Sequence, residues 1–161
     1  DWTFGAEATL SLYSPPPQGT SFDPEATLTR MKTRFDEYIS QLDFENGEYT
    51  FFFPPYSALY WNYAREAGNA VTYLAFKAYA EGKLLECQNV RVFDFQNADF
   101  VTDLDNYKDY THYAPEINDR MLGCFANGKY LVTAPAEAEA LAAKTDAQVT
   151  ELLERYPQVP H

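Results

Sequence analysis

Two short runs limit the folds open to this sequence. The first is a continuous aromatic run, residues 49–53, and the second, residues 89–95, has the composition of a strand but includes Arg91 and Asp94. A continuous apolar run of this length is typical of a strand that is buried on both faces, as in a parallel sheet. The segments between the two runs have helical spacing and break at Gly68 and Asn69. Strands joined by a helical crossover pair in parallel, with a right-handed connection. We therefore expect an α/β fold in which both strands end at the same edge of the sheet.

The remaining segments fit this fold class. Three consecutive prolines, Pro15 to Pro17, predict an irregular lead-in over residues 1–22, because proline fixes φ and removes a donor. Asp23 and Pro24 are the residue types of an N-cap and a first helical position, so a helix begins there. The expected elements are, in chain order, a helix to about residue 43, strand 49–53, helices 56–67 and 70–85, strand 89–95, a loop 96–113, a helix 114–126, a short edge strand 130–133, a helix 136–156 and a tail 157–161. This order predicts a three-layer α/β architecture with a mostly parallel sheet flanked by helices, either as one domain over residues 1–161 or as the carboxyl-terminal part of one.

The charge balance argues against one class of partner. The chain of 161 residues carries 12 basic and 24 acidic residues, which gives a net charge of −12. Binding a polyanion requires clusters of lysine and arginine. The sequence has no such cluster, so nucleic acid is not an expected partner. An anionic membrane surface is disfavoured for the same reason, and no apolar run approaches the ~20 residues that span a bilayer.

The two cysteines, Cys87 and Cys124, do not predict a metal site. They do not form a CxxC pair, and two thiols with distant histidines make a poor zinc signal. Two interpretations stay open, namely a pair of small buried apolar side chains or one disulfide if the protein is exported. The sequence also has no glycine-rich phosphate loop, and we expect neither a metal nor a cofactor.

His112 is the residue best placed for acid–base chemistry, since the other histidine, His161, is terminal. Histidine is the usual general base near neutral pH, and a carboxylate that accepts a hydrogen bond from one ring nitrogen fixes its tautomer. Asp109 lies three residues before His112, in a loop past a strand end, where parallel sheets bind ligands. We expect the ring to lie in a cleft, within hydrogen-bond distance of the Asp109 carboxylate. The alternative is a histidine that pins a surface loop.

Two longer strings give a more specific indication. Residues 103–113 read DLDNYKDYTHY, with Asn118 in the next expected helix, and residues 52–61 read FFPPYSALYW. Together they resemble the carboxyl-terminal half of bacterial envelope-associated SGNH/GDSL hydrolase-like proteins, a group related to enzymes that O-acylate or D-alanylate cell-surface polymers. The resemblance covers about residues 24–135. It implies an SGNH- or flavodoxin-like sheet and an extracytoplasmic protein, membrane-anchored through a segment that is not in this chain.

The resemblance also implies roles for individual residues. In that family a serine attacks an ester, a histidine takes its proton and an aspartate orients the histidine, and Asp109 and His112 match the last motif block. The Gly-Asp-Ser nucleophile block and the Gly-x-Asn-Asp block are absent. The resemblance therefore implies that the nucleophile precedes Asp1, in the N-terminal remainder of the same protein. Ser57 is the best local serine, but the prolines before it remove backbone donors, and we expect it to cap a helix instead.

Aromatic residues from both loops suggest what the site binds. Aromatic faces stack on sugar rings, which predicts a cleft for an acylated envelope glycan, whereas the alternative is that these side chains pack the loops against each other. The predicted substrate contacts are Tyr56, Ser57, Trp61, Asn106, Tyr107 and Tyr113. Two functions stay open, namely part of an SGNH-like serine esterase or acyltransferase and a non-catalytic domain that binds a glycan or a protein.

Overall fold

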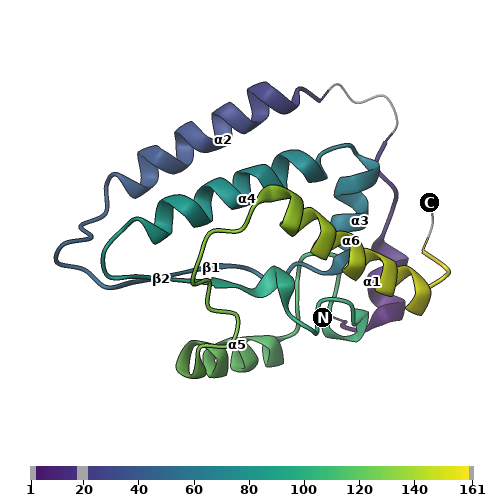
Figure 1. The fold of residues 1–161 in the computed structure, drawn as a ribbon. Coiled ribbons are helices and arrows are strands. Elements are labelled where there is room, and N and C mark those ends of the chain that lie inside the picture. Colours follow the sequence, from purple (N-terminus) through teal and green to yellow (C-terminus); the bar gives the residue numbers. More distant parts are fainter. Residues whose placement is uncertain (1–2, 18–21, 160–161) are drawn as a thin grey trace.

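A computed structural model describes residues 3–17 and 22–159. Its elements are, in chain order, α1 (Ala6–Leu12), α2 (Pro24–Ile39), β1 (Tyr49–Phe53), α3 (Ala58–Glu66), α4 (Ala70–Leu85), β2 (Val90–Asp94), the 3₁₀ turns η1 (Phe95–Asn97) and η2 (Leu104–Asn106), α5 (Pro115–Asn127) and α6 (Ala138–Arg155) (Figure 1). The described part of the chain is thus a mixed α/β fold with six α-helices and one two-stranded parallel sheet.

The two strands pair as the sequence predicts. β1 and β2 are parallel, in a register that runs from Tyr49 beside Val90 to Phe53 beside Asp94. Helices α3 and α4 form the crossover between them. Both strands therefore end at one edge, where the loop that begins at Pro54 and η1 leave the sheet.

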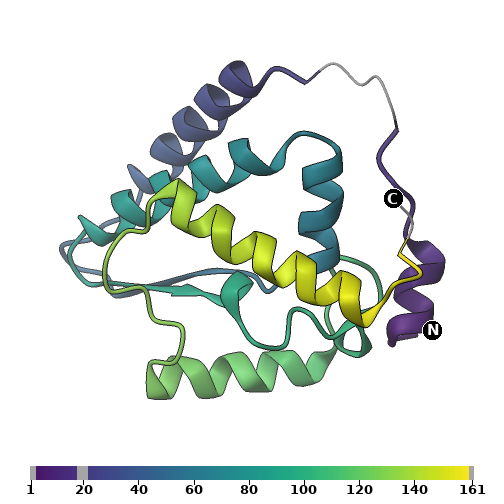
Figure 2. The same ribbon diagram turned by 45° about the vertical axis from the view of Figure 1, so that its right-hand side comes forward.

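Helices lie on both sides of the strand pair (Figures 1 and 2). α4 lies above the strands with α2 outside it, and α5 lies below. β2 is well covered, since Val92 and Phe93 are 0% exposed. The expectation that β1 is buried on both faces is wrong, because Phe52 is 44% exposed. The ring of Phe52 meets Phe125 of α5, with centroids 5.8 Å apart, but α5 does not cover it.

Both ends of the described chain are more structured than the sequence predicts. The expected irregular lead-in contains α1, and the expected tail contains Val159, which is 2% exposed. The backbone N–H of Gly5 and the hydroxyl of Thr9 each donate to the carbonyl of Tyr107, at 2.8 Å. These tertiary hydrogen bonds stabilise a helix that is too short to be stable alone. His161 lies outside the described residues.

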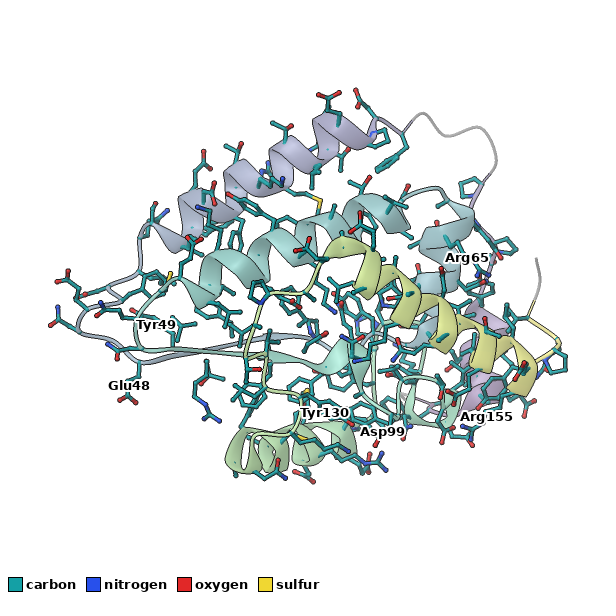
Figure 3. All side chains as sticks on the ribbon, viewed as in Figure 1. Glu48, Tyr49, Arg65, Asp99, Tyr130 and Arg155 are labelled. Carbon is teal, nitrogen blue, oxygen red and sulfur yellow. The ribbon has the colours of Figure 1, made fainter. Side chains whose placement is uncertain are left out.

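The expected edge strand at residues 130–133 is reduced to one antiparallel bridge between Phe93 and Leu131. The reason is local, because Tyr130 has a φ of 66°, in the left-handed region that interrupts a strand. The Tyr130 hydroxyl accepts a hydrogen bond from the backbone N–H of Asp99 at 3.3 Å, so the side chain is tied to the loop after η1 (Figure 3).

Other local expectations hold. Asp23 caps α2, since its Oδ1 accepts a hydrogen bond from the backbone N–H of Ala26 at 3.0 Å. α5 ends at Gly128 in the left-handed conformation, with a φ of 78°. Cys87 and Cys124 are both free thiols, and Cys124 is buried in the core formed by β2, η1 and α5.

Candidate functional site

A tight turn holds the predicted acid and histidine. Tyr107 and Tyr113 form an antiparallel bridge, and the backbone N–H of Lys108 donates to the carbonyl of His112 at 2.9 Å. The base of the turn is fixed in the core, because Tyr107 is 0% exposed and its hydroxyl donates to the carbonyl of Pro55 at 2.8 Å. This bond joins the loop that follows β2 to the loop that follows β1.

His112 and Asp109 are in direct contact. Nδ1 of His112 lies 2.8 Å from Oδ2 of Asp109 and 3.0 Å from Oδ1, within the range expected from their spacing. The same carboxylate accepts hydrogen bonds from the backbone N–H of His112 at 2.9 Å and from the backbone N–H and hydroxyl of Thr111 at 2.9 and 3.0 Å. Partial burial raises the pKa of Asp109, but these hydrogen bonds outweigh it and hold the pKa below its usual value. The carboxylate is therefore ionised at neutral pH.

This arrangement gives the histidine a defined chemistry. A carboxylate that accepts from Nδ1 keeps the ring proton there and places the basic lone pair on Nε2. The side chain of His112 is 58% exposed and that of Asp109 is 23% exposed. The ring therefore lies at the protein surface and not in the cleft that we expected. A group brought to this surface could transfer a proton to Nε2.

Ser57 lies in the interior and its hydroxyl is engaged. Its Oγ donates to the carbonyl of Tyr110 at 2.9 Å, its backbone N–H donates to the same oxygen at 3.2 Å, and it is 0% exposed. Ser57 occupies the N-cap position of α3, but its side chain makes no capping hydrogen bond, because it binds Tyr110 instead. The expectation that Ser57 caps this helix is therefore confirmed for its position but not for its side chain. A nucleophile must be reachable by a base and a substrate, and this hydroxyl is not.

Aromatic rings connect the turn to a cavity. The ring of Tyr110 stacks on that of Tyr63, with centroids 5.5 Å apart and an interplanar angle of 8°, and it lies 6.2 Å from the ring of Tyr60. Tyr60 in turn contacts Tyr56 at 4.8 Å and Trp61 at 5.3 Å between centroids. Tyr56, Tyr60 and Trp61 line a cavity of about 550 Å³. The aromatic residues therefore both pack the loop and form the wall of a cavity.

Two buried polar atoms belong to residues of this cavity. Nε1 of Trp61 and Oε1 of Gln96 have no hydrogen-bond partner within the described residues, and both residues line the cavity. Trp61 is 3% exposed and Gln96 is 8% exposed, so neither side chain can readily form hydrogen bonds with bulk water. A hydroxyl group is both a donor and an acceptor, and can therefore satisfy a donor and an acceptor of this kind.

The other predicted substrate contacts have structural positions. The side-chain amide of Asn106 donates to two backbone carbonyls of its own loop, both at 3.2 Å, and Tyr107 is fully buried. Tyr113 is half-buried, and burial together with the nearby Tyr56 raises its pKa. The structure thus brings Tyr56 and Trp61 to the cavity, whereas Asn106 and Tyr107 stabilise the loop.

The sequence analysis missed a second group of polar residues. Lys77 and Asp94, which are 3% and 6% exposed, form a salt bridge of 2.7 Å between Nζ and Oδ1. Glu81, one turn after Lys77 on α4, is 1% exposed. One pattern in the sequence could have indicated them. Lys77 and Glu81 are four residues apart, on the helix face that also carries the buried Leu74 and Leu84. That spacing is equally typical of a solvated pair.

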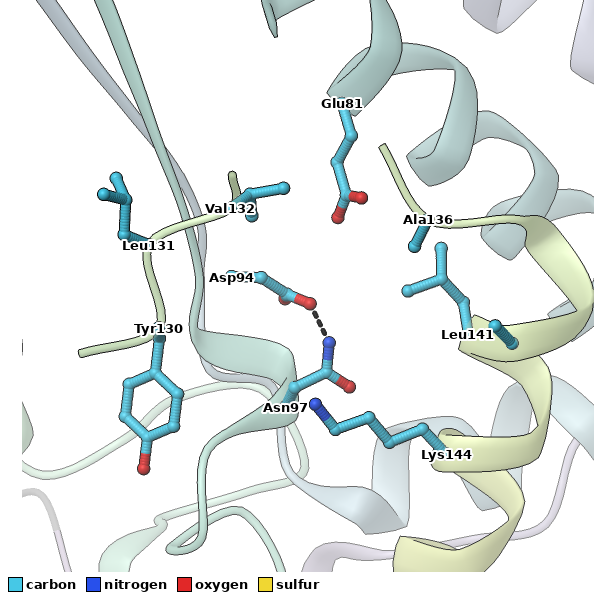
Figure 4. Close-up of a pocket in the computed structure, with 10 residues that line it drawn as sticks. Glu81, Asp94, Asn97, Tyr130, Leu131, Val132, Ala136, Leu141 and Lys144 are labelled. Atoms are coloured by element: carbon cyan, nitrogen blue, oxygen red, sulfur yellow. Dashed lines mark hydrogen bonds between the residues drawn. The ribbon is translucent and has the colours of Figure 1, made fainter. Parts of the chain in front are cut away.

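Glu81 and Asp94 line a second cavity, of about 270 Å³, between β2, α4 and α6 (Figure 4). The side chain of Asn97 donates to the carboxylate of Asp94 at its edge. Burial, and then the charge of Asp94, raises the pKa of Glu81. Lys144 of α6 lines the opposite side.

Searches among protein-family models, curated proteins and solved structures found no match. Over residues 3–17 and 22–159, no group of three or more His, Cys, Asp or Glu side chains is arranged to hold a metal ion. No helix in these ranges is long and apolar enough to cross a membrane. Function is therefore inferred from the chain itself.

Proposed function

We propose that this chain supplies the Asp–His part of an SGNH-like serine esterase or acyltransferase that acts on an acylated cell-envelope glycan. The observation that carries the proposal is the 2.8 Å contact between Nδ1 of His112 and the ionised carboxylate of Asp109, in an exposed turn after β2. In this role Asp109 orients the ring, and His112 takes the proton of an attacking serine. The resemblance of residues 52–61 and 103–113 to SGNH/GDSL hydrolase-like proteins supports the same assignment.

The attacking serine is proposed to come from a segment that precedes Asp1. Ser57 is the best local serine, yet it is fully buried and bound to a backbone carbonyl. The sheet leaves room for a larger domain, because β1 pairs only with β2 among the described residues. We propose that further strands extend the sheet beside β1 into a three-layer, SGNH- or flavodoxin-like arrangement, in an extracytoplasmic protein anchored through a segment outside this chain.

The cavity beside Tyr60 supports a glycan as the substrate. Its volume of about 550 Å³ falls within the range of small-molecule sites. Its wall is aromatic, and aromatic faces stack on sugar rings. The ring of Tyr110 connects this wall to the turn that holds His112.

A non-catalytic domain that binds a glycan is the second candidate. The specific observation in its favour is that the turn itself gives the carboxylate of Asp109 hydrogen bonds from Thr111 and from the backbone of His112. A carboxylate held in this way also fits a residue whose only role is to fix a loop.

The test is hydrolysis of a p-nitrophenyl ester by this chain and by the full-length protein, each as wild type and as His112→Ala, Asp109→Asn and His161→Ala. We expect an active full-length protein, a kcat loss of about 10⁴-fold for His112→Ala and Asp109→Asn, and no change for His161→Ala. The isolated chain should be inactive.

Three results would contradict this assignment. An active full-length protein that His112→Ala leaves unchanged would remove His112 from the reaction. Activity of this chain alone that Ser57→Ala abolishes would refute the external nucleophile. A full-length protein that is inactive on the ester and on acetylated glycans but still binds those glycans would support the non-catalytic function instead.

A further inference from the structure

Opposite charges face the 270 Å³ cavity without pairing with each other. The carboxylate of Glu81 points into this space (Figure 4). The residue is 1% exposed, and its buried Oε1 has no hydrogen-bond partner within the described residues. The backbone of Ala136 forms a hydrogen bond with the same carboxylate. Lys144 reaches in from α6 toward Asn97 and forms no salt bridge in the described part of the chain. A buried carboxylate that forms no salt bridge within the described residues and an exposed lysine therefore line one small space.

The other charged groups at the cavity are already neutralised. Oδ1 of Asp94 accepts from Nζ of Lys77 at 2.7 Å and from the backbone N–H of Gln96 at 3.1 Å. The other carboxylate oxygen accepts from Asn97. An unpaired buried carboxylate is costly, so Glu81 is the group at which a ligand can gain most. The remaining wall includes Leu141, which is apolar.

We propose that this cavity binds a small zwitterion of the α-amino acid class. The ammonium group would donate to the carboxylate of Glu81, and the ligand's carboxylate would pair with Nζ of Lys144. The short side chain would contact Leu141. The volume of 270 Å³ lies just below the range of drug-sized sites, which favours a ligand of this size. The inference does not depend on Asp109 or His112.

The pH dependence of binding follows from the groups around Glu81. Asp94 from β2, Lys77 from the same helix and Lys144 from α6 all act on its charge. Tyr130 also lines the cavity. Because burial raises the pKa of Glu81, part of the population is protonated at a pH where an exposed glutamate is ionised. Binding of the ammonium group needs the ionised form, so affinity should fall as the pH is lowered.

The experiment is isothermal titration of the protein with glycine and L-alanine, with ethylamine and acetate as ligands that carry one charge each. We expect a Kd of about 1 mM or tighter for the amino acids and at least about tenfold weaker binding of the single charges. Glu81→Gln and Lys144→Met should each weaken amino acid binding at least about tenfold. The matched controls are Glu86→Gln and Lys83→Met, which make the same charge changes away from the cavity.

Circular dichroism of each variant checks that the fold is kept, and the exposed Lys144→Met provides the test if Glu81→Gln does not fold. No heat of binding from either amino acid in the wild type would overturn the proposal and leave the cavity to water. If ethylamine bound as tightly as L-alanine, the proposal would also be overturned, since the site would then recognise the ammonium group alone. Unchanged amino acid binding in Lys144→Met would likewise show that the ligand's carboxylate is not recognised by Lys144.

Discussion

The buried ion pair between α4 and β2 gives a sharp prediction for stability. Replacing Lys77 by methionine keeps most of the apolar stem but leaves Asp94 charged at 6% exposure. The carboxylate loses its 2.7 Å contact with Nζ and keeps the backbone N–H of Gln96 at 3.1 Å and the side chain of Asn97. Removing one partner of a buried pair costs about 3–5 kcal/mol. For a chain of this size that lowers Tm by roughly 6–20 °C.

The assay is urea unfolding followed by circular dichroism, for Lys77→Met, Asp94→Asn and the double variant. Because both single variants leave a buried partner behind, the double variant should be less destabilised than the sum by about 0.5–3 kcal/mol. Lys83→Met on the same helix is the control. Its side chain is 42% exposed, and its Nζ lies 3.9 Å from Oε2 of Glu86, which is also exposed. The reasoning is refuted if Lys77→Met costs no more than Lys83→Met, or if the two single effects simply add.

Three further predictions follow from other buried groups. Glu81→Gln should raise the unfolding free energy near neutral pH, because burial raises the pKa of Glu81 and so disfavours its ionised form in the fold. The gain should vanish as the pH falls below 4.5, the ordinary pKa of a glutamate side chain. A gain that does not change with pH would contradict this. Tyr107→Phe should cost about 1–3 kcal/mol in the same urea assay by removing the donor that joins the two loops, whereas Tyr38→Phe, at 70% exposure, should be neutral. Thiol titration of the denatured, unreduced protein should find both Cys87 and Cys124 free, and a bridge would show as their loss.

The strand pair was predictable because its signal is local. Residues 49–53 form a short apolar run bounded by Gly47 and Pro54, and the helical segments after it require a crossover. The burial of each strand face was not predictable, because it depends on which helix covers it. Phe52 is 44% exposed even though its neighbours in sequence are phenylalanines. An aromatic run therefore identifies a strand but does not determine how deeply its faces are buried.

The ends of the chain show the opposite case, in which tertiary contacts outweigh local sequence. α1 has seven residues and begins after Gly5, so its sequence gives little reason for a helix. Hydrogen bonds from Gly5 and Thr9 to Tyr107, about a hundred positions later, stabilise it. Val159 is buried in the same way by a cluster that includes Leu152. No pattern within a single segment carries such information.

In the candidate site, too, contacts within one turn were predictable from the sequence and contacts between distant segments were not. Asp109 and His112 are three residues apart, so a turn suffices to bring them together and their spacing predicted the contact. Lys77 and Asp94 come from a helix and a strand, and only the packing of α4 on β2 makes them a pair. The role of Ser57 also depended on packing, because the carbonyl that accepts its hydrogen bond belongs to Tyr110, in the turn that holds His112.

The turn makes the Asp109–His112 pair suited to proton transfer even though its hydrogen bonds also fit a structural role. The Asp109 carboxylate accepts hydrogen bonds from Thr111 and from the backbone N–H of His112, independently of the imidazole ring. Its position therefore does not depend on the charge of the ring. An ionised group fixed in this way is already oriented when His112 gains a proton, and no reorganisation is needed at that moment. Tyr107 extends the same rigidity into the core through its bond to Pro55. The features that pin the loop are therefore those that a catalytic aspartate requires, and only a change in activity, not in stability, separates the two roles.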